Sequence, residues 1–119
     1  MTLKECYAAM GGNYEDVLTR LRSEKLVQKF IFKFLDDESH KNLHRALEEK
    51  NYEEAFRAAH TIKGVCQNLG LEQLYAASSK LADDLRDGVW KDEYMETVSQ
   101  LDERYEQTAS IIQTLKEES

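Results

Sequence analysis

Apolar residues recur at intervals of three and four along almost the whole chain, a spacing that predicts amphipathic helices rather than strands. Heptad-like spacing of this kind favours an antiparallel helix bundle with left-handed crossing. A single apolar seam also suits a coiled-coil dimer through the last helix, which is the competing interpretation. The clearest series lies near the C-terminus, at Tyr94, Val98, Leu101, Tyr105, Thr108, Ile112 and Leu115.

Three further helices are predicted before that series, over residues 37–50, 51–69 and 71–85. Gly70 follows the middle helix at the position where a glycine commonly ends a helix. Together with the last helix they predict an all-α, antiparallel up-down four-helix bundle over residues 36–117. The middle helix has a clear apolar stripe, made of Tyr52, Ala55, Ala59, Ile62, Cys66 and Leu69.

Short apolar patterns within residues 1–35 predict additional N-terminal helices that cap or extend the bundle. Val27, Phe30, Ile31 and Phe34 form the strongest stripe there and are expected in the core. Phe32 lies off this stripe; it too is expected mainly in the core, with a partner-docking surface as the alternative. With no repeat or linker, residues 1–119 fit a single domain.

Residues suited to helix N-caps precede four of the predicted helices: Thr2, Asn13, Ser23 and Asn51.

Composition narrows the classes of partner. Charged residues make up 33% of the chain and hydrophobic residues 41%, and proline is absent, as in folded helical proteins. The formal net charge of −7 disfavours nucleic acid and anionic membrane surfaces. No segment approaches the ~20 apolar residues of a membrane span, and no signal-peptide pattern is visible. We therefore expect a cytoplasmic protein in which Cys6 and Cys66 are reduced thiols.

One face of the helix predicted over residues 51–69 carries groups suited to chemistry. His60, Lys63, Gly64 and Gln67 lie at i, i+3, i+4 and i+7, so they share the side opposite the apolar stripe. Imidazole has an unperturbed pKa of ~6.5, which leaves a neutral, nucleophilic nitrogen available near pH 7. This helix is thus expected to bury one side and to present a nucleophile on the other.

The arrangement His60-x-x-Lys63-Gly64, followed by Gly70, resembles the motif of histidine-containing phosphotransfer (HPt) domains. The likeness extends from near residue 13 to residue 85. It implies a four-helix bundle whose exposed histidine takes a phosphoryl group from the aspartate of one receiver domain and gives it to another. It also implies a phosphocarrier rather than an enzyme, because the sequence has no ATP-binding segment of its own.

The resemblance further implies the partners. They are response-regulator receiver domains, a hybrid histidine kinase, or both, and we expect the protein to meet them as a monomer. Mg²⁺ is expected in the acidic pocket of the receiver, and the chain needs no cofactor of its own. Two alternatives stay open: a helical adaptor that binds receivers without transfer, and a piece of a larger hybrid sensor kinase.

Each motif residue has an expected role in this interpretation. His60 accepts and donates the phosphoryl group, and the Lys63 ammonium offsets charge on the phosphoryl oxygens. Gly64 costs a helix interior up to ~1 kcal/mol relative to alanine, which is explained if the missing Cβ gives a receiver room to approach. Gln67 is a candidate for a polar contact with the partner or the phosphoryl group.

One position departs from the family pattern. Many members carry a Glu or Gln twenty-two residues after the histidine, where it hydrogen-bonds the imidazole, and here that position is Ala82. The absence argues against the subtype found in chemotaxis kinases. Ser79, Asp83 or water are the remaining candidates for orienting the His60 ring.

His40 and His44 form a second histidine pattern, with the i, i+4 spacing of helical metal ligands. No third ligand is obvious from the sequence, and Glu48, one turn further on, is the only suggestion. We therefore favour structural or surface roles for both histidines and predict no metal site.

Overall fold

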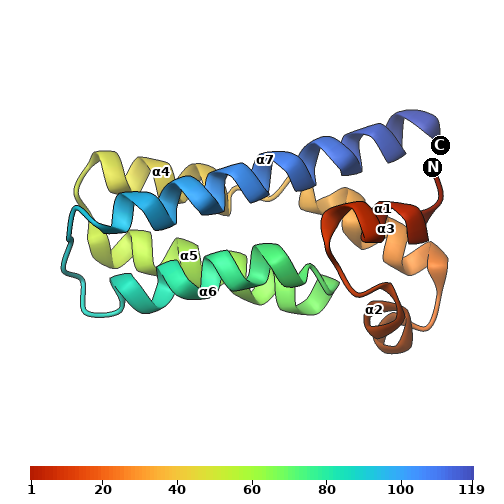
Figure 1. Ribbon diagram of the computed structural model, residues 1–119, viewed down its shortest axis with the longest axis horizontal. Helices are drawn as coiled ribbons and strands as arrows, with labels where there is room; N and C mark the ends of the chain where they lie inside the picture. The colour runs from red at the N-terminus through yellow and green to blue at the C-terminus, as the bar shows by residue number, and fades with distance from the viewer.

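A computed structural model describes residues 1–119 and consists of helices joined by short links, without strands. The last four helices form an antiparallel up-down bundle in which each packs against the next along the chain (Figure 1). This confirms the predicted all-α bundle with additional N-terminal helices. The helices are α1 (Leu3–Met10), α2 (Tyr14–Leu21), α3 (Glu24–Phe34), α4 (Ser39–Glu48), α5 (Tyr52–Leu69), α6 (Glu72–Leu85) and α7 (Tyr94–Glu118).

Side-chain caps begin most of the helices, as predicted. Thr2, Asn13, Ser23 and Asn51 each accept a hydrogen bond from a backbone N–H in the first turn. Helix α4 begins two residues later than expected, because Asp37 Oδ1 accepts from the backbone N–H of Ser39 at 2.8 Å. A short aspartate side chain bound in this way forms a turn before the helix rather than part of it.

Helix α7 determines the length of the molecule. Its 25 residues span roughly 37 Å at 1.5 Å per residue, close to the longest dimension of 41 Å. The predicted seam faces inward: Val98, Leu101, Thr108, Ile112 and Leu115 are buried, and the two tyrosines of the series pack against the core. The seam is thus covered by the chain's own helices, as an intramolecular bundle requires.

The N-terminal helices gather where α7 continues beyond the four-helix bundle (Figure 1). Helices α1 and α3 pack against α7, and α2 packs against α3. The predicted boundary at residue 35 falls in the link between α3 and α4. The two ends of the chain meet there, where the N-terminal ammonium of Met1 lies 2.7 Å from Glu118 Oε1.

This N-terminal region also binds the C-terminal end of α5. The buried Tyr7 hydroxyl donates to the carbonyl of Leu69 at 2.7 Å. Arg20 Nη2 donates to the carbonyls of Gln67 and Asn68 at 2.9 and 2.7 Å. The last carbonyls of a helix have no partner within it, so these donors complete α5.

The stripe expected for α3 is wrong at one position. Val27, Ile31 and Phe34 are buried, but the Phe30 side chain is exposed, at 36% of its maximum. Phe32, which lies off the stripe, is half-buried and packs against the core. Phe30, not Phe32, is therefore the aromatic ring that α3 offers to solvent.

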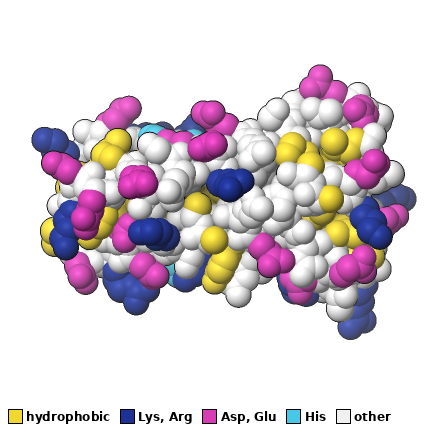
Figure 2. All heavy atoms as spheres, in the orientation of Figure 1, with side chains coloured by type: hydrophobic (Ala, Val, Ile, Leu, Met, Phe, Trp, Pro, Cys, Tyr) yellow, Lys and Arg dark blue, Asp and Glu magenta, His cyan; other side chains and the backbone are white.

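Acidic and basic side chains are mixed over the face drawn in Figure 2, and no continuous basic surface lies on it. None of the seven helices combines the length and the apolar character needed to cross a bilayer.

The Tyr7 hydrogen bond gives a stability test. Tyr7→Phe leaves the buried Leu69 carbonyl without its donor, so we expect the free energy of unfolding to fall by about 1–3 kcal/mol. Tyr14→Phe is the matched control, because the Tyr14 hydroxyl bonds the exposed Glu24 carboxylate and its loss should cost less than ~0.5 kcal/mol. Urea denaturation measures both; equal losses would contradict the assignment.

Candidate functional site

Helix α5 holds the predicted site residues on a rigid element. It begins after Asn51, whose side chain accepts from the Glu54 backbone N–H at 3.2 Å. It ends at Gly70, which adopts the left-handed conformation with φ 68°. The predicted stripe is confirmed: Tyr52 is half-buried and the other members, Ala55, Ala59, Ile62, Cys66 and Leu69, are buried.

His60 lies on the solvent side of this helix, as predicted, and its side chain is exposed. The ring stacks on that of Phe56, one turn earlier, with centroids 5.9 Å apart and planes inclined by 20°. Neither ring nitrogen has a hydrogen-bond partner within the chain. Phe56 therefore restricts the plane of the imidazole and leaves its nitrogens accessible to another molecule.

None of the residues considered for orienting the imidazole bonds it. Ala82 is buried in the core, with 2% of its surface exposed. Asp83 instead accepts from Arg86 Nη2 at 2.7 Å, and Ser79 is half-buried on the same helix. The tautomer of His60 is thus not fixed by any side chain of the protein itself.

The other motif residues lie on the same side of α5. The Lys63 ammonium sits over the Tyr75 ring, 6.0 Å from its centroid, and takes part in no ion pair. Gly64 is open: a Cβ placed on it meets no atom within 4 Å. Gln67 is exposed two turns after His60. The arrangement offers an imidazole, an unpaired cation and uncovered backbone along one line.

An apolar groove of about 420 Å³ lies beside this line, between the N-terminal helices and the second half of α5. Phe30 forms part of its wall, and the Lys33 ammonium lies 5.4 Å from the centroid of that ring. The lining residues are Arg20, Leu21, Phe30, Lys33, Phe34, Asp37, Val65, Asn68 and Leu69.

The cysteines do not offer a second nucleophile. Both are buried and unpaired. Burial raises the pKa of Cys6 to about 11, and burial together with the charge of Asp37 raises the pKa of Cys66 to about 12. A thiol that stays protonated at neutral pH is a poor nucleophile and a poor metal ligand.

Sequence reasoning missed one residue beside the second histidine pattern. His40 and His44 both reach Asp102 on α7, and Glu48 is not part of their cluster. Asp102 follows Leu101 at the edge of the α7 seam, which marks it as a residue near a neighbouring helix. The partner of Asp102 on α4 depends on how the two helices align, and no local sequence pattern predicts that alignment.

Comparison with known families agrees with this geometry. The sequence model of the family described as Hpt domain matches residues 26–116, from the first turn of α3 through most of α7, and the chain belongs to this family. That membership indicates a phosphotransfer role in two-component signalling, where Hpt domains interact with receiver domains and histidine kinases. No curated protein and no solved structure matches the chain.

The open surface at Gly64 can be tested through stability. Gly64→Ala adds a methyl group that meets nothing, so we expect the helix propensity of alanine to raise the free energy of unfolding by up to ~1 kcal/mol. Gly70→Ala is the contrasting change, because a Cβ there would lie 2.9 Å from the Asn13 carbonyl oxygen at φ +68°. Denaturant unfolding should show opposite signs; destabilisation by Gly64→Ala would mean that position 64 is covered.

Proposed function

We propose that the protein is an intermediate of a two-component phosphorelay and that His60 shuttles a phosphoryl group between the aspartates of receiver domains. The observation that carries the proposal is the exposed His60 ring, without a partner in the chain, on a helix of an Hpt-family bundle. The relay operates in the cytoplasm. The protein acts in it as a monomer, since its longest apolar seam is already buried within its own bundle.

The transfer step needs a nucleophile and charge neutralisation. A neutral ring nitrogen of His60 attacks the phosphorus of the receiver's aspartyl phosphate, the bond between phosphorus and the carboxylate oxygen breaks, and a phosphoramidate forms. The reverse attack by a second receiver's carboxylate regenerates the imidazole. Such transfers depend mainly on alignment and electrostatic stabilisation. Mg²⁺ in the receiver's acidic pocket supplies part of the stabilisation, and Lys63 of this chain adds to it.

The receiver docks along the line from His60 to Gln67, where Gly64 lets its backbone approach the imidazole. The adjacent groove with Phe30 offers apolar surface to the same partner. Exposed aromatic residues beside polar groups are common anchors of protein interfaces. The more stable Gly64→Ala protein should therefore transfer phosphate more slowly than the parent.

The assignment of His60 is tested by phosphate acceptance. The chain is incubated with a phosphorylated receiver domain and Mg²⁺, and label that is stable in alkali and labile in acid is measured on the protein. We expect His60→Gln to lose all label, while His44→Gln, a matched change of another histidine, retains it. Label persisting on the His60→Gln protein would sink the proposal.

The role of Lys63 is tested by rate. Lys63→Ala should slow transfer by roughly 5- to 30-fold, corresponding to the 1–2 kcal/mol expected of a partly solvated charge-assisted contact. Lys41→Ala, an exposed lysine of α4, should leave the rate unchanged. Circular dichroism and melting should be nearly unaffected in both proteins. A large loss of fold in Lys63→Ala would show that this side chain supports the bundle instead.

The alternative of an adaptor that binds receivers without transfer is favoured by one observation, the absence of any side chain that bonds the imidazole near Ala82. An adaptor would bind a receiver equally well with His60→Gln and would carry no phosphate. Binding measured by calorimetry beside the labelling experiment separates the two functions.

A further inference from the structure

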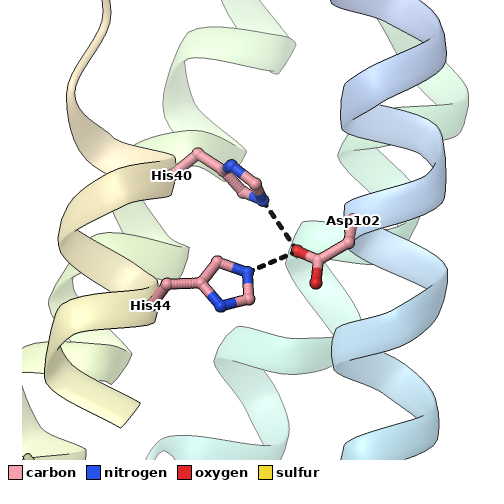
Figure 3. A group of neighbouring side chains, drawn as sticks. All are labelled: His40, His44 and Asp102. Carbon is pink, nitrogen blue, oxygen red and sulfur yellow. Dashed lines mark hydrogen bonds and ion pairs between the residues drawn. The ribbon is translucent and has the colours of Figure 1, made fainter. Parts of the chain in front are cut away.

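Two histidines of α4 converge on one carboxylate of α7. His40 and His44 lie one turn apart, and Nε2 of each ring is 2.7 Å from the same oxygen, Asp102 Oδ1 (Figure 3). These ligand atoms all lie within 4.8 Å of one another. Two nitrogens and an oxygen from separate helices therefore point toward a common centre.

We propose that His40, His44 and Asp102 form a binding site for a divalent transition-metal ion, with Zn²⁺ the ion that fits best. Two imidazole nitrogens and one carboxylate oxygen, with a fourth position left to water, is a common donor set for zinc. Harder ions such as Mg²⁺ and Ca²⁺ prefer oxygen ligands, so the two nitrogens select against them.

The distances suit an ion after a small adjustment. Bonds of about 2.0–2.1 Å in a tetrahedral arrangement place neighbouring ligand atoms ~3.3 Å apart. The present separations from Nε2 to Oδ1 are 2.7 Å, so each must open by ~0.6 Å. An opening of this size is within the reach of side-chain rotation.

Binding replaces the two hydrogen bonds by metal bonds. A carboxylate oxygen only accepts, so each contact with Asp102 Oδ1 requires the proton of that ring to be on Nε2. On binding, a neutral imidazole moves its proton to Nδ1 through solvent, and the freed Nε2 lone pair coordinates the ion. A ring that is protonated beforehand releases one proton to solvent instead. Asp102 coordinates as the carboxylate, and no oxidation or reduction takes part.

A neighbouring aromatic ring holds one histidine of the cluster in place. The His40 ring stacks on that of Tyr105, with centroids 4.0 Å apart and planes 12° from parallel. The stack restricts the plane of the His40 ring, so this ligand loses little further freedom when it binds an ion.

The site remains open to solvent on one side. The side chains of His40, Asp102 and His44 are 17%, 28% and 40% exposed, respectively. An ion can therefore enter and retain a water ligand. The bundle edge between α4 and α7 has few close backbone contacts, so a bound ion would join two helices that otherwise meet through side chains.

Zinc binding is tested on the whole chain with ZnCl₂ by titration calorimetry and thermal melting, and with CoCl₂ by visible absorption. We expect one ion per chain and a higher melting temperature. At a free Zn²⁺ concentration about 100 times the Kd, the unfolding equilibrium constant should fall ~100-fold. The Co²⁺ spectrum should show ligand-field bands of a site with fewer than six ligands.

Matched variants decide which residues bind. Asp102→Asn and His44→Gln should each weaken Zn²⁺ binding by at least ~10-fold, since loss of a direct ligand exceeds the effect of losing an outer partner. Glu106→Gln, an exposed carboxylate one turn further along α7, and His60→Gln should leave the affinity unchanged. Because His44 is the most exposed of the three ligands, its variant stays folded if Asp102→Asn does not.

Three results would overturn the site. The first is that neither the melting temperature nor the Co²⁺ spectrum changes at millimolar metal. The second is that the His44→Gln protein binds Zn²⁺ as tightly as the parent. The third is that the His60→Gln protein loses Zn²⁺ binding. The last would place adventitious zinc on the exposed histidine of α5.

Discussion

The carbonyl groups that end α5 need hydrogen-bond donors, and the placement of the N-terminal helices follows from that need. Tyr7 supplies the donor for Leu69, and Arg20 those for Gln67 and Asn68. The backbone N–H of Asn13 donates to the Gly70 carbonyl at 2.8 Å. Helices α1 and α2 lie outside the residues that match the Hpt family model, and they support the C-terminal end of the helix that carries His60.

The opposite faces of α5 are built from side chains of different size. Ala55, Ala58 and Ala59 are small and buried, which lets α4 and α6 approach α5 closely. On the other face, Gly64 leaves the backbone uncovered and His60 projects into solvent. Small residues inside therefore allow close packing around the helix, while the missing side chain outside leaves its backbone open to solvent. The rotation of α5 about its axis thus determines both which residues pack in the core and which residues of the site are exposed.

Local patterns predicted much of this arrangement. The N-caps, the α5 stripe and the α7 seam each depend on residues close in sequence, and all three were confirmed. Phe30 was misplaced because a helical stripe gives the direction of a side chain but not whether another helix covers it. The pairing of His40 and His44 with Asp102 depends on the alignment of α4 with α7 across 58 to 62 residues. The lack of any partner for the His60 ring likewise became visible only in three dimensions.

The histidines differ in what their nitrogens contact, and this separates two kinds of chemistry within one bundle. The His60 ring has no hydrogen-bond partner in the chain, so the proposed reaction with another protein would break no internal hydrogen bond. His40 and His44 already share a carboxylate, so attack on phosphorus would first have to break that contact. The same contact would favour the proposed metal binding, because ligand side chains that already lie close together lose less conformational freedom when an ion binds. The proposed transfer at α5 and the proposed ion binding between α4 and α7 are thus compatible, and neither requires the other.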